Sequence, residues 1–568
     1  MSLENPHTIF CPAPPLTDPD SNFNGFHPGT SILPMGYRKD PKALPLPCDI
    51  IYMRDVGVVL RDGVRVYCDI FRPNTEEKVP VIFCSSVFGK NGSYVTLDWI
   101  AEKSGSPDRY GIPKGTLSEL QMWEAPDPAF WCSHGYAVAF LDIRGIGMSE
   151  GDAHYFGNQD AEDNYDVIEF LGTQDWSNGC VSMAGNSWLG ITQWYAAAKR
   201  PPHLTCIAPW EGHGNMYVDE YMRGGIPNWA AVREKMGYGN QRTEDLPAEM
   251  AAYPLMNEFW EEKIAPFEDI VCPAYVVASW TSNIHCRGTF EAWQKISSKE
   301  KWLRVHNIQE WPDLYDERSE QDLLRFFDHY MKGKNNGWEN TPQVRLSVLD
   351  PGGRDIIDRI EPAFPIERAE YRKLYLSPDG TLQNENAAAP ATVRYCADDG
   401  VGVARFTIQF TEETEIIGYI KLRAWLSADG ADDMDVFCSV SKKDAEGNYL
   451  YHDARLRVYN GPDQRLRVSL RALDPEKSTP EQPVQTFRRE QKLAPGEIVP
   501  VEIGLWPTSL RFHAGEQMEV ALSGMPYEMH LSDVPGKILP TINHGDHIIH
   551  MGGEYDTYLY VPFIPLDK

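Results

Sequence analysis

One short stretch constrains the fold of this chain more than any other: Cys180-Val-Ser-Met-Ala-Gly-Asn-Ser-Trp-Leu-Gly190. Its apolar start predicts a buried strand that ends at Gly185, and the residues from Leu189 to Ala198 have a helical pattern. Ser187 therefore lies at the apex of a strand–turn–helix, where strained backbone geometry exposes a hydroxyl group. We expect the first helical amide, Trp188 N–H, to face whatever Ser187 attacks. A surface turn with an incidental serine is the alternative interpretation.

The segments around this stretch alternate between apolar strands and helices. Val79 to Ser85, Tyr136 to Asp142 and Leu204 to Pro209 are continuous apolar runs, typical of strands buried on both faces. Such alternation predicts a mostly parallel sheet covered by helices on both faces. Ligands of such sheets bind beyond the carboxyl ends of the strands, which is where Ser187 is expected to lie.

Changes of sequence character divide the 568 residues into domains. The first residues lack periodicity, whereas an aromatic-rich, helix-prone segment later interrupts the strand–helix alternation as an inserted cap would. From about Thr341, period-two strands joined by Gly, Asp, Asn and Pro indicate an all-β sandwich of the jelly-roll class. The predicted organisation is an extended arm at 1–48, an α/β domain at 49–212 and 269–340, a helical cap at 213–268 and a jelly-roll domain at 341–568.

Composition narrows the classes of partner. The formal net charge of −29 disfavours nucleic acid and is expected to reflect a solvated acidic surface. No apolar run approaches the roughly 18 residues of a membrane span, so we expect no membrane partner. Eleven scattered cysteines and the absence of a visible secretory signal predict reduced thiols in a cytoplasmic protein. The arm and the jelly roll offer surface compatible with a homodimer.

Several separated motifs resemble the group of serine hydrolases that contains cocaine esterase and Xaa-Pro dipeptidyl-peptidase. They are Asp69-Ile-Phe-Arg-Pro73, Asp142-Ile-Arg-Gly-Ile-Gly-Met-Ser-Glu-Gly151, Gly185-Asn-Ser-Trp-Leu-Gly190, Ala208-Pro-Trp-Glu-Gly212, Leu374-Tyr-Leu-Ser-Pro-Asp-Gly380, Leu505-Trp-Pro-Thr-Ser509, Arg511-Phe512 and Thr541-Ile-Asn-His544. The resemblance runs from about residue 50 to the end of the sequence. It implies an α/β-hydrolase domain with a helical cap and a C-terminal jelly roll, and it places Ser187 at the family's nucleophile position.

The other catalytic positions of that family are changed in this sequence. The family's aspartate, usually in a Trp-Tyr-Asp setting, is replaced by the segment Trp280-Thr-Ser-Asn283. The family's histidine, in a Trp-Ser-His setting, has no match at the same offset in Val305-His-Asn-Ile-Gln-Glu-Trp311. The family's oxyanion-hole tyrosine corresponds to Phe88, which has no hydroxyl group. The resemblance therefore leaves the base and one oxyanion donor unassigned.

A serine hydroxyl needs a base within hydrogen-bond reach. His306 ends the strand where a triad histidine belongs, and Glu310 or Asp313 could orient it, although a structural histidine is an equal alternative. His285, close to Ser282 and Asn283 in the loop that normally carries the acid, and His213, at the end of another strand, are further candidates. We expect an aromatic pocket for an apolar, ring-containing ligand, with its walls formed by Phe88, Trp188, Trp210 and Trp280.

Neither a cofactor nor a metal is predicted. Arg144-Gly-Ile-Gly147 lacks the glycine spacing of a nucleotide site, and His544, His547 and His550 have no acidic partner at metal-ligand spacing. Three functions stay open. The first is a serine hydrolase acting on an ester, thioester or amide of a bulky apolar small molecule. The second is a lyase, isomerase, cyclase or dehydratase that uses Ser187 and histidines without an acyl-enzyme, and the third is an inactive binding protein.

Overall fold

The computed structural model describes residues 7–90, 95–105, 108–229, 237–454, 458–526 and 541–566. Among these residues, eleven strands form one central sheet. In spatial order they are β13 (Ile356–Glu361), β12 (Val344–Val348), β11 (Lys301–His306), β10 (Ala274–Ser279), β8 (Leu204–Trp210), β7 (Ser177–Asn186), β5 (Val79–Ser86), β6 (Ala137–Asp142), β4 (Arg65–Pro73), β3 (Ile50–Val59) and β2 (Gly29–Leu33).

The middle of this sheet is parallel, as the alternation of strands and helices predicts. The strands from β6 through β5, β7, β8, β10 and β11 to β12 pair in parallel, while β4, β3, β2 and β13 add antiparallel edges. Every residue of β5, β6 and β10 is buried. Continuous apolar runs form such strands because helices cover both of their faces.

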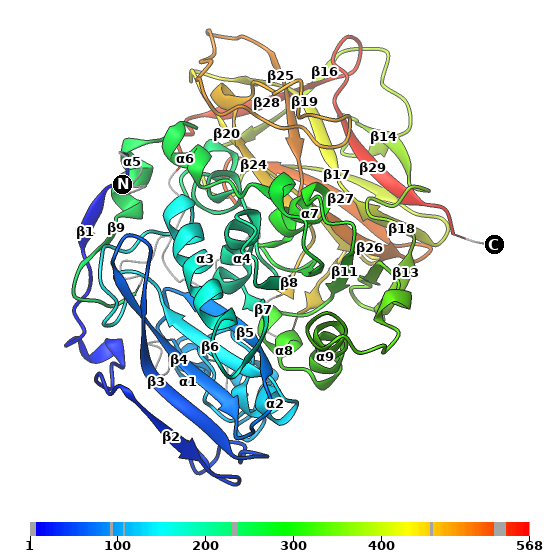
Figure 1. Cartoon of the computed structure of the whole chain (residues 1–568). Coiled ribbons are helices and arrows are strands. Elements are labelled where there is room, and N and C mark those ends of the chain that lie inside the picture. The colour runs from blue at the N-terminus through cyan, green and yellow to red at the C-terminus, as the bar shows by residue number, and fades with distance from the viewer. Residues whose placement is uncertain are drawn as a thin grey trace.

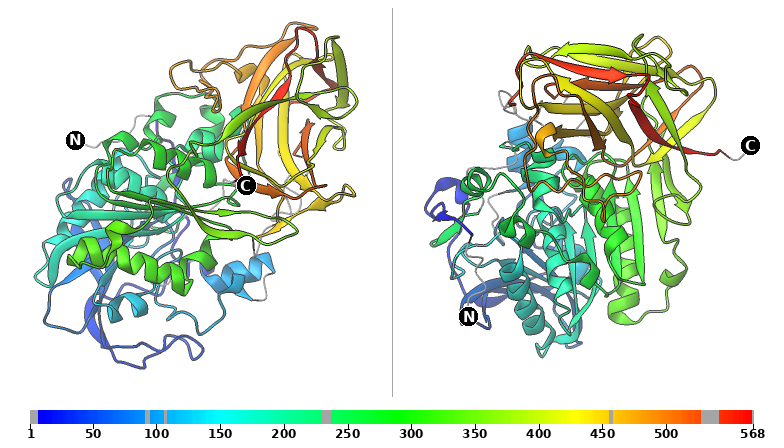
Figure 2. Two further views of the ribbon diagram at one scale, coloured as in Figure 1. Left: turned by 90° about the vertical axis from the view of Figure 1, so that its right-hand side faces the viewer. Right: turned by 90° about the horizontal axis from the view of Figure 1, so that it is seen from above.

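The helices lie on the two faces of the sheet (Figures 1 and 2). One face is covered by α3 (Asn158–Gly172), α4 (Trp188–Ala198) and α7 (Cys286–Lys295), the other by α2 (Pro128–Ser133) and α9 (Glu317–Lys332). Trp131 of α2 and Phe327 of α9 are in ring contact at 5.4 Å, which joins the two helices of the second face. Among the described residues, no helix combines the length and apolarity needed to cross a bilayer.

The arm and the cap lie beside this α/β core. The arm contributes β1 (Phe10–Pro12), which pairs with β9 (Arg242–Glu244) of the cap, and β2, so it is partly strand rather than wholly extended coil. The cap consists of short elements: a π-helical turn at Tyr217–Tyr221, α5 (Leu246–Ala252) and α6 (Glu258–Glu262). Within the helix-prone segment predicted at 213–268, residues 230–236 lie outside the described residues.

The C-terminal part is an all-β domain of curled antiparallel sheets, seen at the top of Figure 1. One sheet contains β14 (Glu370–Leu376), β15 (Leu382–Gln383), β16 (Ala391–Cys396), β18 (Thr414–Gly418), β19 (Lys421–Ala428), β25 (Val499–Gly504), β26 (Thr508–Phe512), β28 (Asp546–Met551) and β29 (Tyr558–Ile564). The other contains β17 (Val403–Gln409), β20 (Asp435–Lys443), β21 (Tyr449–Leu450), β24 (Asp463–Arg467) and β27 (Gln517–Ser523).

The first two strands after residue 340 pair with the central sheet. β12 pairs in parallel with β11, and β13 pairs antiparallel with β12, so both strands extend the central sheet instead of joining the jelly roll. The period-two pattern that begins near Thr341 has a local cause, because β13 is an edge strand with half-exposed residues. A change in strand exposure therefore precedes the change of domain.

Candidate active site

Ser187 occupies the strained turn that the sequence predicts. β7 ends at Asn186, Ser187 has φ 53° and ψ −120°, and α4 starts at Trp188. Ser187 N–H donates to the carbonyl oxygen of Trp210 at 3.2 Å. A Cβ on Gly190 would lie 2.7 Å from that same carbonyl oxygen, so only glycine lets α4 pack this closely on the end of β8. The half-buried Ser187 hydroxyl is thus held at the carboxyl edge of the sheet.

His285 is the imidazole that the structure brings to this serine. Its Nε2 lies 3.1 Å from Ser187 Oγ, within hydrogen-bond distance. His285 is buried in the loop between β10 and α7. Ser282 Oγ accepts its backbone N–H at 3.1 Å, and Thr289 Oγ1 donates to its carbonyl oxygen at 2.9 Å. The backbone of the loop is therefore fixed on both sides of the imidazole.

A second imidazole, that of His213, lies behind His285. The two Nδ1 atoms are 2.8 Å apart and the rings are nearly parallel, with an interplanar angle of 19°. His213 is completely buried after the end of β8. A Cβ on Gly288 would lie 2.5 Å from His213 Cβ, so glycine at this position of α7 gives the imidazole its space. Glu220, on the π-helical turn of the cap, places its Oε2 3.3 Å from His213 Nε2.

His306 lies in a different environment, which corrects its assignment as the base. It ends β11, separated from β7 by β10 and β8, and its Nε2 lies 2.7 Å from Glu211 Oε1 and 3.8 Å from Asp313 Oδ2. Burial lowers the pKa of His306, but the charges of Asp313 and Glu211 outweigh burial and raise it above its ordinary value. Its imidazole is therefore directed at carboxylates, while His285 is the imidazole within hydrogen-bond distance of Ser187.

Asp313 therefore does not orient a catalytic histidine beside Ser187. Both of its carboxylate oxygens pair with Arg304, at 2.8 and 2.6 Å. Burial raises the pKa of the Asp313 carboxyl, yet the charges of Arg304 and His306 dominate and lower it to about 2. Burial also raises the pKa of the Glu211 carboxyl, against the opposing effect of His306. We call Glu211, His306, Asp313 and Arg304 the ion-pair cluster.

The oxyanion side of the site consists of backbone and rings. Trp188 N–H belongs to the orphan donors at the start of α4. Phe88, after β5, places its ring centroid 6.1 Å from that of Trp188, and its own N–H donates to Ser86 Oγ at 3.1 Å. Lys90 anchors this loop, because its N–H donates to Asp142 Oδ1 at 2.7 Å and its ammonium group pairs with Asp55 and Asp69.

The aromatic wall is built from partly different residues than expected. Phe156 and Tyr155 pack on Trp188 with ring centroids at 4.2 and 5.2 Å, in addition to Phe88. Trp210 instead lies in the core, stacked on the Arg304 guanidinium. Trp280 is also a core residue, and its Nε1–H donates to the Ser347 carbonyl oxygen at 2.7 Å. Trp210 is the last residue of β8 and Trp280 directly follows β10, and at such positions the sequence does not reveal which face a side chain takes.

The remaining candidates support the site without touching the serine hydroxyl. Asn283 is exposed in the loop before His285. Glu310 accepts a hydrogen bond from Asn186 Nδ2 through its backbone carbonyl, at 3.0 Å, and so ties α8 (Glu310–Leu314) to the residue before the serine. Sequence reasoning missed Glu211 and Glu220. No spacing signal could have found Glu220, because it reaches His213 from an irregular cap segment.

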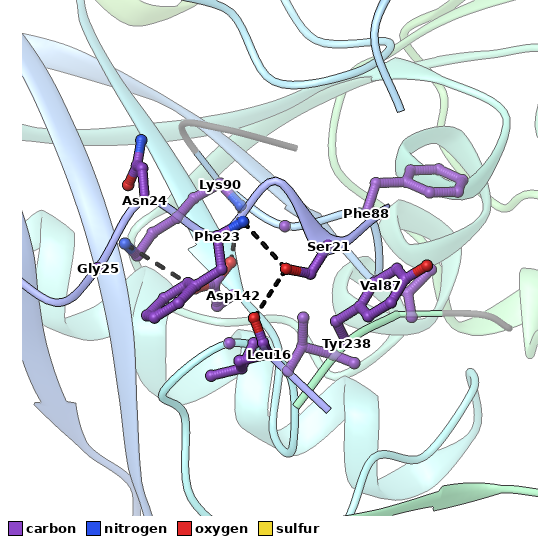
Figure 3. A pocket seen from close by; sticks show the side chains of 13 residues that line it. Leu16, Ser21, Phe23, Asn24, Gly25, Val87, Phe88, Lys90, Asp142 and Tyr238 are labelled. Carbon is purple, nitrogen blue, oxygen red and sulfur yellow. Dashed lines mark hydrogen bonds and ion pairs between the residues drawn. The ribbon is translucent and has the colours of Figure 1, made fainter. Parts of the chain in front are cut away.

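The cavity of Figure 3 lies between the arm and the Phe88 loop. Phe88 extends to one side of it and Lys90 to the other, and Ser21 and Tyr238 also line it. Its volume of about 40 Å³ suits a few water molecules and is far below the hundreds of Å³ of a small-molecule site. A larger hollow, lined by Val79, Asn178 and Lys332, lies at the start of β5 and β7, at the opposite edge from Ser187.

Two clusters of potential metal ligands have other partners. Asp350, His513 and Glu516 converge, but the ammonium group of Lys442 lies 2.8 Å from both Asp350 Oδ1 and Glu516 Oε2. A cationic side chain already compensates these carboxylates. In the β domain, His547 contacts Tyr395 and Asn543, and His550 contacts Ser427, so each imidazole has its own hydrogen-bond partner.

Comparisons with known proteins agree with this architecture. Residues 62–253 match the family described as X-Pro dipeptidyl-peptidase (S15 family), and residues 336–560 match the X-Pro dipeptidyl-peptidase C-terminal non-catalytic domain. The chain is 30% identical over 407 residues to a cocaine esterase from Rhodococcus sp. (strain MB1 Bresler). That match covers 57% of this chain and 62% of the esterase, less than two thirds of the relative's length.

Solved structures extend the likeness to nearly the whole chain. An α-amino acid ester hydrolase shares the fold, with 16% identity, a TM-score of 0.67 and coverage of 93% of this chain and 98% of that one. A CocE/NonD family hydrolase from Staphylococcus aureus is 33% identical, with a TM-score of 0.87 and coverage of 97% of this chain and 100% of that one. The chain belongs to the CocE/NonD family of α/β hydrolases and is a serine-hydrolase-type enzyme.

Proposed function

We propose that this enzyme hydrolyses esters, thioesters or amides of bulky apolar small molecules through an acyl-enzyme on Ser187, with His285 as the general base. The single observation that carries the proposal is the 3.1 Å distance between Ser187 Oγ and His285 Nε2 at the strained elbow. A nucleophile and a base within hydrogen-bond reach form the signature of covalent acyl transfer.

The steps follow from this geometry. His285 Nε2 takes the proton of Ser187 as Oγ bonds to the substrate carbonyl carbon, and Trp188 N–H donates to the oxyanion that forms. His285 then protonates the leaving group as its bond to carbon breaks. Water attacks the acyl-enzyme in the same manner, giving its proton to His285 and releasing the acid. No tyrosine hydroxyl assists, because Phe88 is at that position.

The aromatic rings around Trp188 support the apolar substrate class. Phe88, Tyr155 and Phe156 pack around this residue, directly after the nucleophile. Rings of this kind give apolar contact area and orient aromatic ligands by edge-to-face packing. A polar or strongly charged acyl group would have to be desolvated among them.

A fluorophosphonate probe tests this function directly, because it phosphorylates an activated serine. We expect label on Ser187 in wild type, none in Ser187→Ala, and an acyl-enzyme adduct in the mass spectrum after rapid quenching with a p-nitrophenyl ester. Labelling of the folded protein at another residue, or ester turnover by Ser187→Ala at the wild-type rate, would refute the assignment.

A further inference from the structure

We propose that His213 and Glu220 are positioning residues of this hydrolase, which fix the tautomer of His285 and stabilise the proton it takes from Ser187. This inference rests on the proposed function. It replaces the single carboxylate of the usual serine triad with an imidazole and a carboxylate in series, the carboxylate being supplied by the cap. We call Ser187, His285, His213 and Glu220 the relay.

The distances determine how protons are arranged in the relay. His285 must have an unprotonated Nε2 to accept from Ser187, so its neutral form carries the proton on Nδ1. The 2.8 Å contact between the two Nδ1 atoms holds one proton, which His285 then donates to His213. His213 in turn must carry its own proton on Nε2, and this nitrogen faces Glu220 Oε2 at 3.3 Å. A single tautomeric pattern satisfies the two hydrogen bonds and places a proton on the nitrogen that lies at ion-pair distance from Glu220.

The same pattern provides a path for charge during catalysis. When His285 Nε2 takes the proton of Ser187, the Nδ1 proton of His285 can move to His213 Nδ1. The positive charge then lies on His213, next to the Glu220 carboxylate, and no proton is lost or gained. When the tetrahedral intermediate collapses, the protons return and His285 Nε2 protonates the leaving group. Because an imidazole is neutral, the carboxylate beyond it is needed to stabilise this charge.

Glu220 is the carboxylate available for this role. Asp219 of the cap lies near the same position of α7 as His213, because a Cβ on Gly288 would meet both residues, but its carboxylate pairs with Arg287 at 2.6 Å. Arg287 also pairs with Glu291 at 2.9 Å, so the charge of Asp219 is compensated within that group. Among the described residues, Glu220 is the carboxylate within ion-pair distance of His213 Nε2, and Asn228 Nδ2 donates to its backbone carbonyl at 3.1 Å.

The position of Glu220 links the cap to the chemistry. Its π-helical turn, Tyr217–Tyr221, adds a residue to the helical turn, and such turns recur at functional sites. Consecutive residues of the turn face different partners, since Asp219 reaches Arg287 and Glu220 reaches His213. A displacement of the cap would therefore weaken the base as well as reshape the substrate site.

The test compares the variants His213→Gln and Glu220→Gln with a matched control pair. His203 and Glu169 form a similar histidine–glutamate contact at 2.7 Å, away from Ser187, so His203→Gln and Glu169→Gln make the same chemical changes outside the relay. The substrate is p-nitrophenyl butyrate, kcat and KM are measured from pH 5 to 9, and thermal unfolding verifies that each variant is folded.

We expect His213→Gln to lower kcat by about 10²–10⁴-fold with KM little changed, by analogy with the loss of the correct histidine tautomer in serine proteases. Glu220→Gln should lower kcat by about tenfold and move the acidic limb of the kcat/KM profile to lower pH. The direction follows because loss of a negative charge lowers the pKa of the imidazoles. Glu220→Asp should restore the limb in part, and the control variants should match wild type.

Two outcomes would overturn the inference while the proposed function stands. If His213→Gln and Glu220→Gln behave like the control pair while Ser187→Ala is inactive, His285 acts as the base without help from His213 and Glu220. If the acidic limb of the kcat/KM profile does not shift in Glu220→Gln, the Glu220 carboxylate has no role in the relay. This result would refute the inference even if His213→Gln failed to fold. Absence of Ser187 labelling in wild type would instead contradict the proposed function itself.

Discussion

Two buried histidines near the carboxyl edge of the central sheet differ in the groups that surround them. His285 faces the hydroxyl group of Ser187 and the imidazole of His213, at 3.1 and 2.8 Å. His306 faces the carboxylates of Glu211 and Asp313. The charges of these carboxylates raise the pKa of the second imidazole above its ordinary value. The sequence position that resembles a triad histidine has thus become part of an ion-pair network.

Replacing each of the two histidines in turn should give the largest expected difference in labelling rate. His285→Gln should reduce the rate of fluorophosphonate labelling at Ser187 by about 10³-fold or more, because the serine loses its base. His306→Gln should reduce it less than about tenfold. Labelling rates under pseudo-first-order conditions measure both. If His306→Gln proved the more damaging of the two in folded protein, the contrast between the clusters would be wrong.

Breaking the ion-pair cluster should affect stability much more than chemistry. Asp313→Ala leaves the buried Arg304 without its bidentate partner, and removing one member of a buried pair costs about 3–5 kcal/mol. The loss is measured as the change in the free energy of unfolding of the α/β domain transition in urea. The labelling rate per folded molecule should stay near wild type. Asp269→Ala, which removes an exposed pair with Arg200, is the control and should cost far less.

The pH dependence of stability distinguishes the two histidines more finely. Because the pKa of folded His306 is raised, its contribution to stability is complete below its unfolded pKa of about 6.5 and is lost as pH rises through the folded value. The gap in urea midpoint between wild type and His306→Gln should therefore narrow from pH 6 to pH 9. A gap that widens with pH would contradict the raised pKa of His306.

The smallest expected effect concerns Phe88, on the oxyanion side of the site. Phe88→Tyr places a hydroxyl group at the position where the family resemblance implies an oxyanion-hole tyrosine, and we expect acylation to speed up about threefold to tenfold. The gain stays below the full value of an oxyanion donor, about 10²-fold or more, because the surrounding loop has not been shaped around it. Phe156→Tyr, the same change on the other ring beside Trp188, should bring no gain. Pre-steady-state burst rates with a p-nitrophenyl ester measure both.

Local patterns in the sequence predicted most of the fold. Apolar runs such as Val79 to Ser85 become strands buried on both faces, and the strand–turn–helix around Ser187 has the strained geometry that its glycines and serine predict. The later period-two strands form the all-β domain. The alternation that begins near Thr341 does not distinguish an exposed edge strand from a sandwich strand, and β13 is an edge strand of the central sheet.

The tertiary structure determines which imidazole lies beside Ser187. Ser187, His213, Glu220 and His285 come from four separate segments, and they meet because the chain returns to one sheet edge after each strand. Sequence alone determined that a reactive serine and several imidazoles reach that edge. A shift of a few residues in a loop decides which imidazole touches the serine, and such a shift depends on long-range packing, as at Gly288 and Gly190, that no local pattern records.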